Sequence, residues 1–382
     1  MPNHSNCSIR MRLKRGTPLL IFVMANHSRC LTQLCECFRG CVPKHADWMS
    51  LLGLANQTLT TPALMEFVTR FKDRIPEDVC RYIREMFERN VARNDRLAAQ
   101  LAETVAAMND RGVTPVLLKG AAMFATAPRP HWGSRLMSDL DIMVLPDQVD
   151  ATLDALFALG YSEHFLTPPD AGKWYMELKR PSDVGMVDLH RELPGPAFFY
   201  RPTGDVKQHC RMMPIGRGRA YIPSATYQAL ILTIHDQFQD SDYWTGKIDV
   251  RHLIELRDLA ISPEGIDWET LAALTPSKLA RNALETQLVA LFCLLGVDVP
   301  THMRSRFVPR LQHRRRLAQA RVPLMRQVLL PIALLDFRNY RDELGRSNRG
   351  GEIVNDRKWT LPKSDTLRFM LALSREQRAG KI

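Results

Sequence analysis

Two aspartates separated by one residue are the side chains of this sequence best suited to metal chemistry. Asp139 and Asp141 lie in residues 138–144, where apolar residues fill most other positions. A β-strand here would place both carboxylates on one face and Leu140 and Ile142 on the other. Adjacent carboxylates repel each other unless a cation neutralises them, and Mg²⁺ takes a few carboxylate oxygens while leaving positions for water and phosphate. The pair is a candidate magnesium site, although this spacing is also common at exposed strand ends.

A glycine turn lies upstream of this pair. We expect residues 112–118 to form a buried strand that leads through Lys119 and Gly120 into a short helix. Glycine allows the backbone to approach a ligand closely, and the first N–H groups of a helix attract anions. A loop over residues 128–135 then ends in a cation, Arg135, shortly before the aspartates. This arrangement suits a phosphate-bearing ligand.

A third acid is expected on a later hairpin. Residues 174–179 and 184–190 show the pattern of two strands joined by a turn. Along the second strand Met186, Asp188 and His190 share one face. From the pattern alone, Asp188 is either a solvated strand residue or a further metal ligand.

The stretch from Val116 to Tyr161 resembles the uncharacterised nucleotidyltransferase family, within the DNA-polymerase-β-like nucleotidyltransferase superfamily. The resemblance is carried by the Leu-Lys-Gly turn at 118–120, by Arg135, by the run Met137–Asp141 and by Leu-Gly-Tyr at 159–161. It starts near Trp48 and continues into the helices after residue 223, so it covers most of the chain.

The resemblance implies an α+β fold: a nucleotidyltransferase-type mixed β-sheet with flanking helices, an N-terminal helical segment and a C-terminal helical domain. It also implies transfer of an NMP from an NTP such as ATP to an acceptor hydroxyl, through two Mg²⁺ ions. The metal ligands and catalytic residues would be Asp139, Asp141 and Asp188. The nucleotide-binding residues would be Lys119, Gly120, Ser134, Arg135 and Ser138.

One position departs from the superfamily pattern. A serine usually follows the glycine of the turn, and the acidic pair comes about a dozen residues later. Here Ala121 follows Gly120, and the acids lie further along. A non-catalytic binding or scaffold protein with a degenerate transferase domain is therefore an alternative, as is a phosphohydrolase that uses water as the acceptor.

The apolar pattern divides the chain into four parts. We expect residues 1–45 to be a disordered basic extension and residues 46–111 to be a helical segment. Residues 112–222 form the predicted α/β core, and residues 223–382 a helical domain with a basic tail. Ser224 is the expected N-cap of the first helix of that domain.

Polar residues of the helical domain are weaker candidates. His235 and Asp236 follow a leucine-rich helix, and packing explains this histidine better than substrate contact does. Asp249, Arg251 and His252 form a polar cluster that could line the acceptor side.

Charge is distributed unevenly along the chain. The formal net charge is +11, and residues 301–382 contain 19 Lys and Arg against 7 Asp and Glu. Residues 1–45 contain 7 Lys and Arg against 1 Asp or Glu, whereas residues 46–300 contain 26 Lys and Arg against 33 Asp and Glu. The basic ends indicate either contact with a phosphate-bearing partner or an arginine-rich solvated surface.

Composition and apolar runs bear on where in the cell the protein is expected. No apolar run is long enough to span a bilayer, so no membrane partner is expected. Arg10 and the apolar residues 19–25 imitate a weak secretory signal, but an enzyme that uses NTPs is expected in the cytoplasm. Cysteines 30, 35, 37 and 41 lack a zinc-binding spacing.

Overall fold

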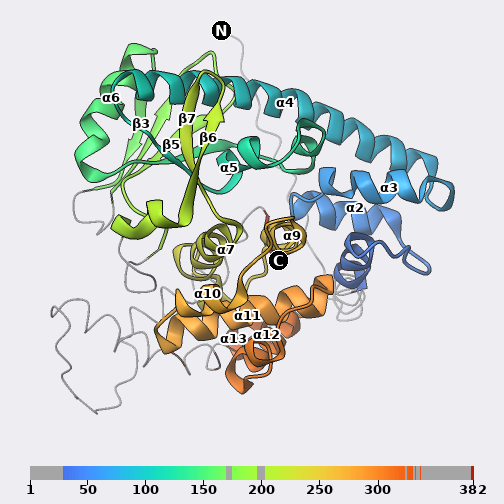
Figure 1. Ribbon diagram of the computed structural model, residues 1–382. Helices are drawn as coiled ribbons and strands as arrows, with labels where there is room; N and C mark the ends of the chain where they lie inside the picture. The colour runs from blue at the N-terminus through green and yellow to red at the C-terminus, as the bar shows by residue number, and fades with distance from the viewer. Residues whose placement is uncertain are drawn as a thin grey trace, which may run out of the picture.

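A mixed seven-stranded β-sheet packs against one long helix, and a group of shorter helices lies beside it (Figure 1). The computed structural model describes residues 29–168, 174–195, 203–322, 325–329, 332, 336 and 380–382. The strands are β1 (Val116–Leu117), β2 (Asp139–Met143), β3 (Ser162–Leu166), β4 (Tyr175–Lys179), β5 (Met186–His190), β6 (Cys210–Ile215) and β7 (Gly218–Pro223). The sheet and its flanking helices confirm the predicted α+β fold.

The helices fall before, within and after the sheet. Residues 29–38 are helical. The other α-helices of the described residues are α2 (Trp48–Gln57), α3 (Met65–Arg70), α4 (Glu77–Asp110), α5 (Lys119–Thr126), α6 (Val149–Ala158), α7 (Ala225–Ile234), α8 (Asp242–Thr245), α9 (Val250–Ile261), α10 (Trp268–Ala273), α11 (Lys278–Leu295), α12 (Phe307–Arg321) and α13 (Met325–Val328). Short 3₁₀ turns include η1 (Pro62–Leu64), η2 (Lys72–Arg74), η3 (Arg129–Ser134), η4 (Pro146–Gln148), η6 (Thr203–His209) and η8 (Thr301–Met303), and η7 (His235–Gln239) is a π-helix.

The strand order of the sheet is β3-β4-β5-β2-β1-β7-β6. β2 runs parallel to β5 and β1 runs parallel to β7, while the other neighbouring strands are antiparallel. The hairpin β4–β5 agrees with the pattern read from the sequence. Its second strand lies beside β2, so residues almost fifty positions apart in the chain become neighbours.

Helix α4 covers one face of the sheet, and in Figure 1 it runs along the upper edge of the molecule. Its apolar residues Leu97, Leu101, Val105 and Met108 are buried in a core shared with strands β1, β2, β4 and β5. Sequence periodicity predicts this helix over residues 76–111, and the structure confirms it.

The helices on either side of the sheet in the sequence share a second core. Residues of α2, α3 and the start of α4 join those of α7, α9, α10 and α11 in one buried cluster. Leu34, Cys35 and Cys37 belong to it, so part of the segment expected as a disordered extension, residues 29–38, is a buried helix. Ser224 caps α7 as predicted, since its side chain accepts a hydrogen bond from the N–H of Tyr227.

The arginine run of α12 is mostly buried. Arg315 and Arg316 are 2% and 1% exposed. Arg315 donates to the backbone carbonyls of Tyr243 and Trp244, and Arg316 donates to Gln237. These two cations therefore stabilise the helical domain and cannot belong to an exposed basic surface. Most of the basic tail lies outside the described residues. No helix of the described part is long and apolar enough to cross a membrane.

Two asparagines of α4 hold the loop that precedes β2. Asn94 donates from Nδ2 to the carbonyls of Trp132 (2.7 Å) and Arg135 (2.9 Å), and Asn90 donates to those of Gly133 (2.8 Å) and Arg135 (2.7 Å). Both asparagines are buried. The loop that carries Ser134 and Arg135 is thus fixed by the helix rather than by the sheet.

Replacing Asn94 with alanine should lower the free energy of unfolding by about 2 kcal/mol, because buried carbonyls lose their donor. Urea denaturation of the full chain measures this change. Arg89→Ala on the same helix is the control: Arg89 is 70% exposed, and its loss should cost less than about 0.5 kcal/mol. Equal effects of the two substitutions would contradict the anchoring role of Asn94.

Candidate active site

Three carboxylates meet on one face of the sheet, at strands β2 and β5. The register pairs Asp141 with Asp188 and Asp139 with Met186 across the parallel strands. Paired residues of neighbouring strands point to the same face, so Asp139, Asp141 and Asp188 face one side. Asp141 and Asp188 are 4% and 8% exposed, and Asp139 is partly exposed. The common face of Met186, Asp188 and His190, predicted from strand alternation, is confirmed.

Lys119 places its ammonium group against this cluster. β1 runs antiparallel to β2, and the N–H of Leu118 donates to the carbonyl of Asp141, so the chain turns into α5 beside that residue. Lys119 adopts a left-handed backbone conformation, with φ of 46°, which is unusual for a residue with a side chain. Its Nζ lies 2.7 Å from Oδ1 of Asp141. The strand-to-helix turn thus supplies the positive charge of the site.

Further hydrogen bonds from β4 and β5 reach the carboxylates of Asp141 and Asp188. Nε2 of His190 lies 3.2 Å from Oδ1 of Asp141. The hydroxyl of Tyr175 on β4 lies 2.8 Å from both Oδ2 of Asp188 and Oε1 of Glu177. Oδ1 of Asp188 is buried and has no hydrogen-bond partner among the described residues. A buried carboxylate oxygen left in this way is suited to binding a cation.

Burial, mutual repulsion and nearby cations give the three acids different pKa values. Burial, followed by the charges of Asp141 and Asp139, raises the pKa of Asp188 to about 8. Burial and then Asp141 also raise the pKa of Asp139. For Asp141, the effect of burial is outweighed by the Lys119 ammonium and by His190, and its pKa is lowered. The pKa of Asp141 is therefore lowered, whereas the pKa values of Asp139 and Asp188 are raised by burial and by neighbouring negative charges.

The loop residues expected at the nucleotide lie around the acids in different ways. The positive charge of Arg135 partly opposes the rise in the pKa of Asp139. The Nη1 atom of Arg135 donates a hydrogen bond to Glu255 of α9. Ser138 forms a hydrogen bond with Asp139 and is exposed. Gly120 is buried, and a side chain there would meet Met137 and Arg135. Ser134 ends η3, and the described contacts do not join it to the acids.

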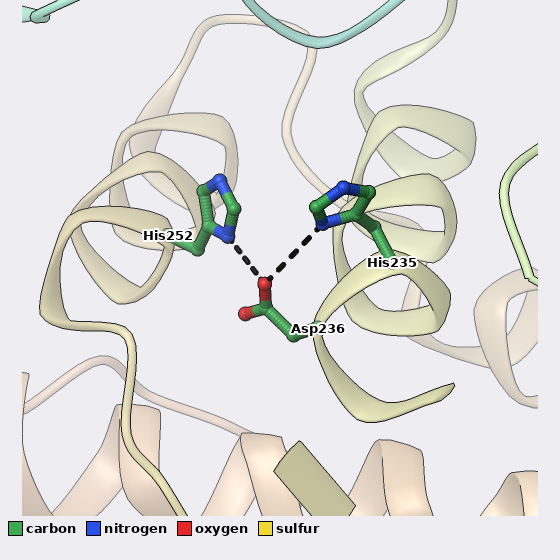
Figure 2. A group of neighbouring side chains, drawn as sticks. All are labelled: His235, Asp236 and His252. Atoms are coloured by element: carbon green, nitrogen blue, oxygen red, sulfur yellow. Dashed lines mark hydrogen bonds and ion pairs between the residues drawn. The ribbon is translucent and has the colours of Figure 1, made fainter. Parts of the chain in front are cut away.

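Helix α9 and the turn after α7 face the acids from the helical domain. Glu255 of α9 holds Arg135. Arg251 lies one helical turn earlier. Burial lowers its pKa, but nearby carboxylates, first Asp249 and among the others Asp139, outweigh this effect and raise it. Burial, followed by the Lys119 ammonium, lowers the pKa of His235. His235 and its neighbours Asp236 and His252 are drawn in Figure 2. The helical domain therefore forms a wall of the site.

The residues present fit a divalent cation. One ligand atom each from Asp141, Asp188 and His190 lies within 4.8 Å of the other two. Asp139 is outside this compact group, although the three aspartates share a face. Two buried carboxylates with an adjacent third acid supply the oxygen ligands that Mg²⁺ prefers, and they leave positions for phosphate.

Several residues of the site are missing from the sequence prediction. His190 shares the face of Asp188, so strand alternation alone could have identified it. Tyr175 and Glu177 alternate in the same way along β4, but only the strand pairing shows that they reach Asp188. Glu255 lies about 120 residues after Arg135 in the sequence, and no local pattern connects the two.

The fold and the acidic cluster define a nucleotidyltransferase-type α+β protein. The model of the uncharacterised nucleotidyltransferase family matches residues 44–295, more than half of the chain. The chain belongs to this family, as the motifs of its sequence indicate. No match was found among curated proteins or among solved structures. The matched residues include the whole sheet, the three aspartates and helices α2 to α11.

Lys119→Met should destabilise the protein in the absence of divalent metal, because Asp141 loses its counter-charge within a buried cluster. Removal of one partner from a buried ion pair costs about 3 kcal/mol. Urea denaturation in EDTA measures the change in the free energy of unfolding. Lys179→Met, at the exposed last residue of β4 in the same sheet, is the control and should change stability by less than about 0.5 kcal/mol. A Lys119→Met protein as stable as this control would show that the ion pair does not hold the site together.

Proposed function

We propose that this protein transfers an NMP from an NTP to an acceptor hydroxyl in the cytoplasm. Asp139, Asp141 and Asp188 would hold two Mg²⁺ ions. The observation that carries the proposal is the register of β2 and β5, which sets Asp141 beside Asp188 on one face with Lys119 against them, in a chain of a nucleotidyltransferase family. A bound cation offsets the charge repulsion within such a cluster, and the same cation can bind a polyphosphate.

The chemistry is an in-line displacement at the α-phosphorus. The acceptor oxygen forms a bond to phosphorus as the bond to the bridging oxygen breaks, and pyrophosphate leaves with its electron pair. Bound Mg²⁺ would lower the pKa of the acceptor hydroxyl and stabilise the leaving charge. Asp188 would assist in removing the hydroxyl proton. The protein contributes mainly by positioning and charge stabilisation.

Five further groups would contact the triphosphate. Lys119, Ser138 and Arg135 surround the acids, and the backbone of Gly120 lies at the start of α5. A Cβ at Gly120 would lie 2.9 Å from Cε of Met137 and 3.0 Å from Nε of Arg135, closer than side chains normally approach, so the position favours glycine. Ser134 completes the group assigned from the sequence. The hydroxyl that usually follows the glycine is replaced by Ala121, so these donors must supply the missing hydrogen bond.

Titration calorimetry of ATP, CTP, GTP and UTP into the full chain, with Mg²⁺ and with EDTA, tests the proposal. One or more NTPs should bind in a magnesium-dependent way. Asp139→Ala/Asp141→Ala should weaken that binding by at least about tenfold, equivalent to about 1.4 kcal/mol. In turnover, loss of about 4 kcal/mol of transition-state stabilisation would lower the rate about a thousandfold.

Asp150→Ala/Asp154→Ala is the matched control, since it removes two exposed acids from α6 and should leave NTP binding unchanged. If no NTP binds folded protein at millimolar concentration, the transferase proposal is wrong and the scaffold alternative gains support. Release of free NMP from the NTP in place of pyrophosphate release with an NMP-linked acceptor would instead identify a hydrolase.

A further inference from the structure

A second polar cluster lies in the helical domain, where α7 ends and α9 begins. His235, Asp236 and His252 each offer one ligand atom, and these three atoms lie within 4.8 Å of one another. In Figure 2 both imidazole rings approach the same oxygen of Asp236 from opposite sides. We propose that this cluster binds Zn²⁺ or a similar divalent transition metal through the two Nδ1 atoms and Oδ1 of Asp236.

The spacing of the ligand atoms is close to that of a tetrahedral site, except that Nδ1 of His252 forms a short hydrogen bond with Oδ1 of Asp236, which a bound metal would replace. Zn²⁺ binds histidine and carboxylate ligands at about 2.0–2.2 Å, which separates neighbouring ligand atoms by about 3.4 Å. Nδ1 of His235 lies 3.8 Å from Oδ1 of Asp236. Oδ2 of Asp249 lies 3.5 Å from Nδ1 of His252. The fourth position would be taken by Asp249 or by water.

Two of these atoms are buried without a hydrogen bond. Nδ1 of His235 and Oδ2 of Asp249 have no hydrogen-bond partner among the described residues. Asp249 is 3% exposed and Asp236 is 1% exposed. Buried polar atoms nearly always have a partner, so the unpartnered Nδ1 of His235, which faces Asp236, is suited to binding a ligand.

The backbone also departs from regular structure at this point. Consecutive residues of an α-helix point about 100° apart and do not face each other. His235 and Asp236 are consecutive, yet their ligand atoms converge. They occupy the first two positions of the π-helix η7, which replaces the last turns of α7. Short π-helical segments are rare and frequent at functional sites, and here the wider turn directs both side chains toward α9.

The surroundings hold the proposed ligands in place. Nε2 of Gln287 on α11 donates to Oδ2 of Asp236 at 3.3 Å, and Oδ1 of Asp249 accepts the N–H of His252 at 3.0 Å. Ligating carboxylates are usually fixed by such outer contacts. Two imidazoles with carboxylates favour Zn²⁺ and its neighbours over Mg²⁺, which prefers oxygen ligands such as the three carboxylates of β2 and β5.

Arg251 distinguishes the metal-free and metal-bound forms. Its Nη2 lies 3.3 Å from Nε2 of His252 and 3.9 Å from Oδ2 of Asp249. Without metal, His252 donates from Nδ1 to Asp236 and accepts from Arg251 at Nε2. A metal on Nδ1 leaves the ring proton on Nε2, so Arg251 must turn toward Asp249. A purely hydrogen-bonded cluster is therefore a defined alternative, and it binds no metal.

Competition with a chromogenic zinc chelator, on full-length protein stripped of metal, tests the proposal. The Asp139→Ala/Asp141→Ala protein is the background, because it disables the carboxylate cluster. It should still bind one Zn²⁺ per chain. Addition of His235→Ala/His252→Ala should weaken that binding at least about a hundredfold, more than the loss of an outer contact usually causes.

His131→Ala/His164→Ala is the matched control, because it removes two exposed histidines and should leave the affinity for Zn²⁺ unchanged. Asp236→Asn, which preserves the size of the side chain, serves if the double histidine variant does not fold, and it should show the same loss. No Zn²⁺ bound by the background protein, or equal binding after loss of His235 and His252, would overturn the proposal. Magnesium-dependent NTP binding is a separate measurement, so each proposal can fail alone.

Discussion

The burial of Asp141 beside Lys119 is the interaction on which the rest of the site depends. A carboxylate that is 4% exposed is costly unless a cation accompanies it. Lys119 supplies that cation from a strained, left-handed position at the end of β1, and the Nζ–Oδ1 distance of 2.7 Å is that of a charge-assisted hydrogen bond. The ion pair keeps one acid ionised while burial raises the pKa of Asp188. The site therefore combines a fixed negative charge with a carboxylate that ionises readily only when another cation arrives.

Local patterns were sufficient for the parts of this site that lie within single strands. Alternation along residues 138–144 and 184–190 places the acids on defined faces, and the register of β2 and β5 agrees with both. The same patterns could not show that these strands are neighbours, because β3 and β4 come between them in the sequence and are placed beyond β5 in the sheet. The family resemblance supplied that long-range information. It did not supply Tyr175, whose contact with Asp188 depends on the pairing of β4 with β5.

Charge composition was a weaker guide than position. The arginines of α12 contribute to the basic end of the chain, yet Arg315 and Arg316 are buried against backbone carbonyls and glutamine side chains of the helical domain. Formal charge counts cannot distinguish an exposed cation from one that satisfies buried acceptors. The predicted boundary near residue 45 shows a similar limit of charge composition. The helix at 29–38 packs into the core through apolar and cysteine side chains, although the segment around it has a basic composition.

Helix α9 joins the two polar centres of the molecule. Arg251 and Glu255 are four residues apart and therefore share a face, which is directed toward Arg135 and the carboxylates of the sheet. His252 contacts Asp236 through Nδ1, and its Nε2 lies 3.3 Å from Nη2 of Arg251. Asp249 is the N-cap of the same helix, so Arg251, His252 and Glu255 are all held by one element. The proposed metal site and the acidic cluster of the sheet therefore share α9 as a structural support, the kind of contiguous element through which two sites can be coupled.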